Sequence, residues 1–151
     1  MNEFRFELAT LNDLDDILAL ENESFVDPYK EKDLIYEISE NPLNKYLLIK
    51  KNGLLVGFLD YMVTFNSATI NQIAVKKEYR RQGIATKLLN EMFESFPKDI
   101  EDVVETVTLE VRESNEAARK LYESVGFEKV VIKKNYYKDG ENAVYMVKRI
   151  L

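Results

Sequence analysis

The segment of residues 73–86 constrains this chain more than any other. It reads Ile-Ala-Val-Lys-Lys-Glu-Tyr-Arg-Arg-Gln-Gly-Ile-Ala-Thr, so an apolar strand ends, a basic turn follows and a helix begins among small residues. Free backbone N–H groups at a helix start bind anions, and the helix dipole adds to the attraction. Gly83 and Ala85 allow the backbone to approach a ligand closely. The segment therefore predicts a polyanion site at a strand-to-helix turn.

The local charge favours this interpretation over an ordinary helix start with a solvated basic surface. Five of the twelve residues in 76–87 are Lys or Arg and one is acidic, although the whole chain has a net charge of −6. The segment lacks the Gly-Lys-[Ser/Thr] of a Walker loop and the Gly-x-Gly-x-x-Gly of a dinucleotide loop. ATP and NAD are therefore weaker candidates for the anion.

Hydrophobic periodicity along the chain predicts an α/β layer fold with one mixed sheet. Strands are expected at residues 4–8, 46–49, 54–61, 68–75, 103–111, 127–132 and 143–147. Helices are expected at about 14–25, 33–39, 83–96 and 117–125. The order is β-α-α-β-β-β-α-β-α-β-β, in a single domain of residues 1–151.

Short polar motifs mark the ends of these elements. Thr10 with Asp13 three residues later is typical of a capping box before the first helix. The Asn-Gly of residues 51–53 predicts a hairpin turn, and Ser114 or Asn115 is expected to cap the last helix.

The absence of cysteine and histidine excludes several kinds of catalytic site. Without cysteine there is no disulfide framework, thiolate metal site or thiol nucleophile. Histidine is the commonest metal ligand and the usual general base near neutral pH. Proton transfer must therefore use carboxylates, tyrosine, lysine or water, and no metal cofactor is implied.

Charge and hydropathy also bear on partners and location. A net charge of −6 makes nucleic-acid binding by bulk electrostatics unfavourable. The N-terminal residues lack the apolar region of a signal peptide, and no apolar run reaches the length of a membrane span. We expect a cytoplasmic protein without nucleic-acid or membrane partners, as a monomer or weak homo-oligomer.

The motif Arg80-x-x-Gly83-x-Ala85 resembles the acetyl-CoA signature of the Gcn5-related N-acetyltransferase (GNAT) family, [Arg/Gln]-x-x-Gly-x-[Gly/Ala]. The element order is also similar to that family's, so the resemblance covers essentially the whole chain. It implies a mixed, mostly antiparallel sheet flanked by helices. In the family, the turn amides hold the CoA pyrophosphate and the preceding strand pairs with the pantetheine arm. The implied acetyl-CoA contacts are Ile73, Val75, Arg81, Gln82, Gly83, Ala85 and Thr86.

Residues 109–127 resemble more specifically a block of the bacterial ribosomal-protein-alanine N-acetyltransferases, Leu-Glu-Val-Arg-x-Ser-Asn-x-x-Ala-x-x-Leu-Tyr-x-x-x-Gly-Phe. Residues 135–143 resemble their Asn-Tyr-Tyr…Asp-Gly-x-[Asp/Glu]-Asp-Ala segment, with Asn142 in place of Asp. By this resemblance Glu110 is the general base, directly or through water, and Tyr122 is the acid for the departing CoA thiolate. Asn115, on the helix face of Tyr122, would bind the donor. Taken alone, Tyr122 could be a core aromatic and Glu110 half of a surface ion pair.

The acceptor is expected to be an amine. At pH 7 roughly one α-amino group in ten is neutral, against about one lysine in 2,500, so a weakly basic carboxylate suits an α-amine better. The resemblance implies a protein N-terminus, first of all a ribosomal protein beginning with alanine. A small amine, a lysine side chain or a non-catalytic acetyl-CoA-binding module are the alternatives.

The expected acceptor groove has two walls. The implied groove residues are Phe25, Tyr29, Tyr136 and Tyr137, with the loop after the first helix facing the two C-terminal tyrosines. Alternatively, Phe25 belongs to the core, and Tyr136 and Tyr137 are surface residues of a hairpin with no role in binding. Gln72 replaces an Asn usual in the bacterial enzymes, and Ser67 stands where several relatives carry Glu, which leaves the acceptor's identity open.

Overall fold

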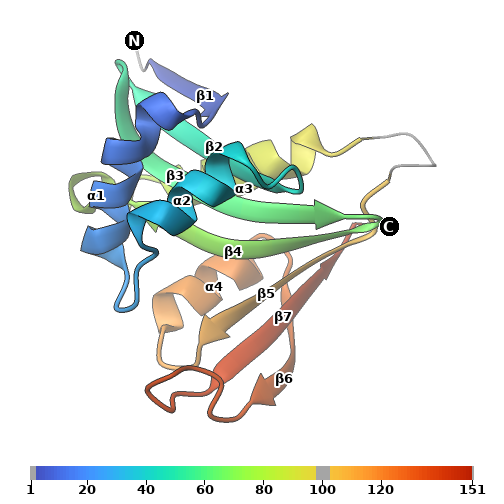
Figure 1. Ribbon diagram of the computed structural model, residues 1–151. Helices are drawn as coiled ribbons and strands as arrows, with labels where there is room; N and C mark the ends of the chain where they lie inside the picture. The colour runs from blue at the N-terminus through green and yellow to red at the C-terminus, as the bar shows by residue number, and fades with distance from the viewer. Residues whose placement is uncertain (1–2, 98–102, 151) are drawn as a thin grey trace. The chain divides into compact units, whose positions relative to one another are not determined.

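The computed structural model describes residues 3–97 and 103–150, and its elements follow the predicted order (Figure 1). The strands are β1 (Phe4–Leu8), β2 (Asn44–Lys51), β3 (Leu54–Thr64), β4 (Ser67–Val75), β5 (Thr106–Arg112), β6 (Glu128–Lys133) and β7 (Ala143–Arg149). The helices are α1 (Leu14–Ser24), α2 (Glu31–Ser39), α3 (Ile84–Ser95) and α4 (Glu116–Ser124). Two 3₁₀ turns, Leu11–Asp13 and Lys77–Tyr79, precede α1 and α3.

The strands form a mixed sheet in the order β1-β2-β3-β4-β5-β7-β6. The pairs β1–β2, β2–β3, β5–β7 and β6–β7 are antiparallel. β4 and β5 are parallel, with Ser67 opposite Thr106 and Ile70 opposite Leu109. The predicted α/β fold with a mixed, mostly antiparallel sheet is therefore confirmed.

Some predicted boundaries were wrong. β2 extends from Asn44 to Lys51, beyond the apolar run, because backbone pairing with β1 and β3 does not require apolar side chains. The strand expected from residue 103 begins only at Thr106. Just before it, the N–H of Glu105 donates to the carbonyl of Asn66 in the β3–β4 turn, at 2.7 Å.

The chain divides into two compact units. Unit 1 contains the described residues 3–62 and 72–95, and unit 2 contains 63–71, 96–97 and 103–150. β4 contributes residues 67–71 to unit 2 and 72–75 to unit 1.

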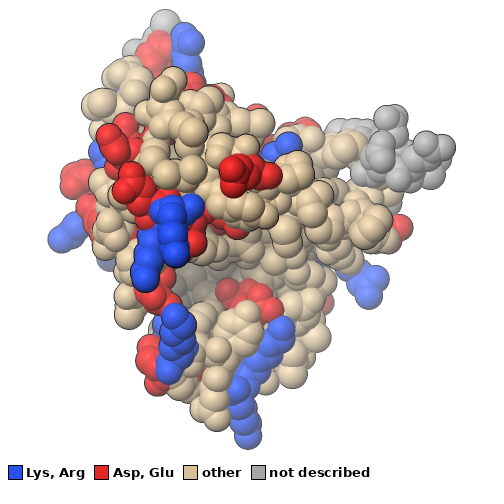
Figure 2. Space-filling view, viewed as in Figure 1, with Lys and Arg blue, Asp and Glu red and all other residues tan. Residues whose placement is uncertain are grey.

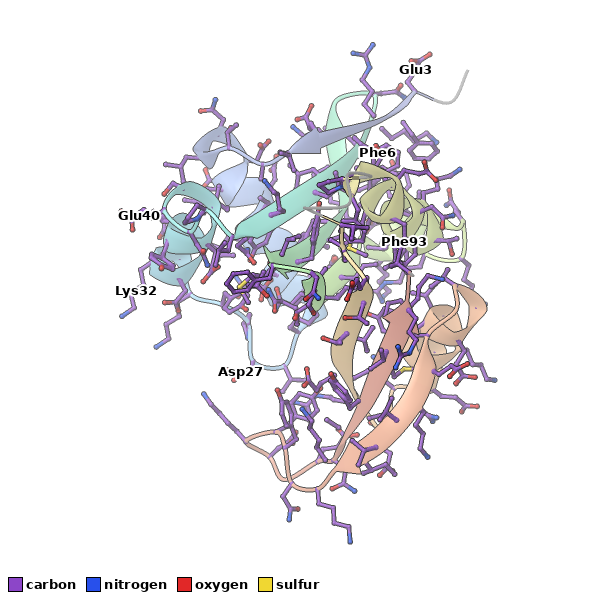
Figure 3. All side chains as sticks on the ribbon, turned by 90° about the vertical axis from the view of Figure 1, so that its right-hand side faces the viewer. Glu3, Phe6, Asp27, Lys32, Glu40 and Phe93 are labelled. Carbon is purple, nitrogen blue, oxygen red and sulfur yellow. The ribbon has the colours of Figure 1, made fainter. Side chains whose placement is uncertain are left out.

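Unit 1 has a layer of helices on each face of β2 and β3. α1 and α2 cover one face and α3 covers the other (Figures 1 and 3). The core beneath α1 and α2 consists of Ile17, Leu20, Leu34, Tyr46, Leu48, Leu55, Phe58 and Ala74. On α3 the buried side chains are Ile84, Leu88, Leu89 and Met92, as the helical spacing predicts. The predicted capping box of Thr10 and Asp13 is present.

Gly57 of β3 lies close to the end of β4 and the start of α3. A Cβ at this position would lie 2.9 Å from the carbonyl oxygen of Ala74 and 3.3 Å from the Cγ2 atoms of Ile49 and Ile84. The absence of a side chain at Gly57 therefore lets the end of β4 and the start of α3 pack against β3.

Glu21 of α1 is a fully buried carboxyl group in the same unit. Its Oε1 accepts from the N–H of Tyr29 at 2.9 Å and from Nε2 of Gln72 at 2.7 Å. Its Oε2 is buried and has no hydrogen-bond partner in the part of the chain that the structure describes. Burial raises the pKa of Glu21, and the two hydrogen bonds oppose that rise.

Unit 2 is built on β5, whose side chains alternate between the two faces. Val107, Leu109 and Val111 are buried, so Glu110 lies on the opposite face, as the period-2 pattern predicts. The C-terminal end of α4 is tied to β7 by Lys148, whose Nζ donates to the carbonyl of Val125 at 2.8 Å.

We expect Gly57→Ala to lower the free energy of unfolding by about 1–3 kcal/mol, because the new methyl group meets a backbone oxygen that cannot rotate away. Thermal and urea unfolding measure the change. Leu54→Ala, at a strongly exposed position on the same strand, is the control and should change stability by less than about 0.5 kcal/mol. Equal effects of both substitutions would contradict the close approach.

We expect Glu21→Gln to remove a pH dependence of stability. Because the folded-state pKa of Glu21 is raised, its contribution is complete below its ordinary value of 4.5 and is lost as the pH rises through the folded pKa. The stability of the variant relative to the wild type should therefore increase from pH 4 to pH 8. Urea titrations across this range provide the measurement, with Glu23→Gln, exposed on the same helix, as control. A pH-independent difference would show that Glu21 ionises as readily folded as unfolded.

Candidate active site

The turn after β4 is held firmly at both sides. The N–H of Lys76 donates to the carbonyl of Val56 on β3 at 2.8 Å, which keeps the end of β4 on its neighbour. Nε of Arg80 donates to the carbonyl of Val75 at 3.1 Å, across the 3₁₀ turn. The basic segment therefore has a defined conformation that positions the start of α3.

The backbone between this turn and α3 presents unpaired N–H groups. The first backbone bond into the helix runs from the N–H of Lys87 to the carbonyl of Gly83, at 3.0 Å. The N–H groups of residues 81–86 donate to no described residue. Arg81 and Gly83 have φ values of 64° and 75°, a left-handed conformation that non-glycine residues such as Arg81 rarely adopt. A run of free N–H groups at a helix start, next to left-handed residues, is an arrangement that can bind an anion.

The residues predicted to contact the donor lie around these N–H groups and on β4. Arg81 and Gln82 are exposed, and Ala85 and Thr86 are half-buried at the first turn of α3. The side chain of Gln82 makes one long hydrogen bond, in which Nε2 donates to the carbonyl of Glu78 at 3.4 Å. The remaining two predicted contacts, Ile73 and Val75, are half-buried on β4.

Two further lysines near this turn were not predicted as contacts. Nζ of Lys51 lies 5.6 Å from the ring centroid of Phe4 and 5.7 Å from that of Tyr79, and Nζ of Lys87 lies 5.9 Å from that of Phe4. These aromatic contacts hold positive charge beside the basic turn. Lys87 belongs to the basic segment of residues 76–87. Lys51 is the last residue of β2, and only folding brings it close to Tyr79 of that segment.

In unit 2, Glu110 forms an ion pair with Lys133 of β6, with Oε1 and Nζ 2.7 Å apart. The side chains are 22% and 40% exposed, so the pair is partly shielded from water. The hydrogen bond to Glu110 raises the pKa of Lys133, which therefore stays protonated near neutral pH. The ion-pair interpretation of Glu110 is thus correct for the structure, and it does not exclude a catalytic role.

Tyr122 of α4 is 5% exposed and packs edge-on against Phe127, with ring centroids 5.6 Å apart. Burial raises its pKa, and the nearby Tyr137 adds to the rise. Burial also raises the pKa of Tyr137, with Glu110 among the smaller causes. Tyr137 therefore interacts electrostatically with both predicted catalytic residues, which places all three in one region of unit 2.

Arg112 fixes the loop that carries Tyr136 and Tyr137. Its Nη1 lies 2.9 Å from Oδ2 of Asp139 and 2.9 Å from Oε1 of Glu141, and its guanidinium carbon lies 4.1 Å from the ring centroid of Tyr137. Hydrogen bonds from Ser114, together with Arg112, lower the pKa of Glu141 to about 2. The loop is therefore held by a charged clamp at neutral pH.

The two tyrosine rings lie edge to face, with centroids 5.0 Å apart and an interplanar angle of 83°. Asn142, which replaces an expected Asp, accepts from the N–H of Asn135 at 3.0 Å and donates to Oε1 of Glu113 at 3.2 Å. The amide at this position therefore connects the loop to the end of β5 through both of its polar atoms.

Asn115 is the N-cap of α4. Its Oδ1 accepts from the N–H of Ala118 at 3.1 Å, which selects Asn115 over Ser114 as the capping residue. Because the oxygen serves the cap, the amide nitrogen is the atom left for the predicted contact with the donor.

The loop between α1 and α2 belongs to unit 1. Phe25 and Tyr29 are half-buried and pack against the unit 1 core, and burial raises the pKa of Tyr29. Val26 is 86% exposed, and Asp27 lies at the tip of the loop (Figure 3). The core packing that the sequence left as an alternative for Phe25 is therefore present, and its acceptor contact stays a prediction.

Nowhere within residues 3–97 and 103–150 do three or more Asp or Glu side chains gather into a set that could hold a metal ion. None of the described helices combines the length and hydropathy of a membrane span. Acidic and basic side chains lie next to one another over α1 and α2 (Figure 2).

Known proteins are similar to this chain in sequence and in fold. The Acetyltransferase (GNAT) family matches residues 14–127. The chain is 37% identical over 137 residues to the ribosomal protein bS18-alanine N-acetyltransferase of Escherichia coli K12, covering 89% of each chain. It is 32% identical over 158 residues to the N-alpha-acetyltransferase of Saccharolobus solfataricus, covering 97% of this chain and 93% of that protein. The crystal structure of the Escherichia coli ribosomal-protein-S18-alanine N-acetyltransferase matches with a TM-score of 0.85 at 30% identity, over 97% of this chain and 94% of that one. The chain therefore belongs to the GNAT family of acetyltransferases, which take their acetyl group from acetyl-CoA.

Proposed function

We propose that this enzyme transfers acetyl from acetyl-CoA to the α-amino group of a protein N-terminus, with a ribosomal protein beginning with alanine as the first candidate. The names of the Escherichia coli and Saccharolobus relatives support a protein α-amine as acceptor. A cytoplasmic location fits this role, because new ribosomal-protein N-termini arise there.

The run of unpaired N–H groups at residues 81–86 carries the donor half of the proposal. The pyrophosphate of CoA offers acceptor oxygens and negative charge, which satisfy the backbone donors and the helix dipole together. Arg81 and Gln82, both exposed, are available to add contacts from their side chains.

The catalytic half assigns the base to Glu110 and the acid to Tyr122. The neutral amine attacks the thioester carbon, its surplus proton passes to Glu110, and the C–S bond breaks. A thiol has a pKa of about 8.5. Because the pKa of Tyr122 is raised above its usual 10, complete proton transfer to the thiolate is uphill. Tyr122 therefore acts first as a hydrogen-bond donor to the developing charge on sulfur.

The proposed acceptor site is based on the loop that carries Tyr136 and Tyr137 and that Arg112 holds in place. Arg112 holds the ring of Tyr137, and tyrosine hydroxyls can bind the carbonyl groups of a peptide. A small amine or a lysine side chain is the second candidate acceptor, because Gln72 departs from the residue usual in the bacterial enzymes.

We expect CoA release from acetyl-CoA with short peptides beginning with Ala, Ser or Met, and much less with spermidine or free lysine. An N-terminally blocked Ala peptide is the control and should be inert. Mass spectrometry of the product locates the acetyl group. Turnover restricted to the small amines would overturn the acceptor while leaving the donor site intact.

We expect Gly83→Ala to raise the KM for acetyl-CoA at least several-fold, because a side chain is strained at φ +75° and the N–H groups then rotate out of place. Gly53→Ala is a matched control, with φ +82° and equally open space, at the β2–β3 hairpin. Both variants should lose about 1 kcal/mol of stability, but only the first should lose donor affinity. Equal KM values would contradict the anion site.

We expect Tyr122→Phe to lower kcat by roughly 10²–10³-fold with little change in the dissociation constant of acetyl-CoA. The phenyl ring keeps the edge-on contact with Phe127, so thermal unfolding should stay close to wild type. Single-turnover kinetics and calorimetric binding separate the two effects. Full turnover with a peptide acceptor would exclude the hydroxyl of Tyr122 from the reaction.

A further inference from the structure

Lys133 is held from several sides by groups of unit 2. Its Nζ lies 2.7 Å from Oε1 of Glu110, 4.5 Å from the ring centroid of Tyr145 and 5.5 Å from that of Tyr136. A surface lysine normally samples many rotamers, and an isolated exposed ion pair contributes at most about 1 kcal/mol. Two aromatic contacts restrict this ammonium beyond what an ordinary surface pair requires.

A bulge in β6 brings Lys133 onto the face of Glu110. Lys129 lies opposite Met146, but Val131 lies opposite Tyr145, so Val130 is an extra residue in the strand. The extra residue reverses the alternation of all following side chains. Lys133 therefore shares a face with Tyr145, which is itself opposite Glu110 on β5.

The ion pair leaves one carboxylate oxygen of Glu110 available. Oε1 is taken by Lys133, whereas Oε2 accepts no hydrogen bond from any residue that the structure describes. A carboxylate held at one oxygen presents the other in a fixed direction. Proton abstraction depends on such orientation, and small misplacements of a catalytic group are costly.

We infer that Lys133 is a positioning residue that orients Glu110 for proton abstraction and links it to the acceptor loop through Tyr136. Lys133 itself stays protonated throughout. The N–H bond of the attacking amine breaks, a bond between that proton and Oε2 of Glu110 forms, directly or through one water, and the electron pair remains on nitrogen. This inference rests on the proposed function, because it requires Glu110 to be the base.

A double-mutant cycle tests this inference. We expect Lys133→Met to lower kcat roughly tenfold with an unchanged KM for acetyl-CoA, and Lys133→Arg to recover most of that loss. In a Glu110→Gln background, Lys133→Met should cause no further loss, because its effect acts through the carboxylate. Lys129→Met, at an exposed position on the same strand, should leave kcat unchanged.

The outcomes separate this inference from the proposed function. Multiplicative losses in the double variant, or a wild-type kcat for Lys133→Met beside a severe loss for Glu110→Gln, would overturn the role of Lys133 alone. A wild-type kcat for Glu110→Gln would overturn the base assignment itself. A loss in Lys133→Met that follows reduced thermal stability, and that Lys133→Arg does not recover, would mark the pair as structural.

Discussion

The unpaired N–H groups of residues 81–86 are the constraint on which unit 1 depends. Backbone donors left without a partner are costly unless water or a ligand satisfies them, so a fold that presents a row of them must hold them in place. The left-handed Arg81, the bond from Lys76 to Val56 and the close approach at Gly57 all serve that end. An anion with several oxygens would offset this cost.

The element order could be predicted because each element carries its own local signal. The apolar face of α3, the capping box at Thr10 and the Asn-Gly turn all depend on residues close in sequence. Both residues of that turn, Asn52 and Gly53, have positive φ, as the hairpin requires. The boundaries that failed depend on partners far along the chain. Asn44 and Lys45 are polar, yet they pair with Met62 and Tyr61 on β3.

The candidate site likewise has one part that local sequence predicts and one part that depends on residues far apart in the chain. The candidate anion-binding turn is contiguous in sequence, so its residue types and spacing were enough to predict it. The ion pair of Glu110 and Lys133 joins residues 23 positions apart and exists only because Val130 is bulged. Hydrophobic periodicity gives no signal for a single extra residue in an edge strand. Without this extra residue, Lys133 would lie on the other face of the sheet. The contact of Arg112 with Tyr137 could be predicted only in part. The alternation of β5 places Arg112 on the face of Glu110, but it does not identify Tyr137, Asp139 and Glu141 as its partners.

The pairing of the proposed base, Glu110, with the ammonium of Lys133 also bears on the acceptor. Lys133 holds one oxygen of the Glu110 carboxylate, so the pair would contribute orientation to proton abstraction. Orientation suffices more readily for an α-amine with a pKa of about 8, of which about a tenth is already neutral at pH 7. It suffices less readily for a lysine acceptor, whose proton is held about 2.4 pKa units more tightly. An oriented carboxylate beside Lys133 therefore fits a protein N-terminus better than a lysine side chain.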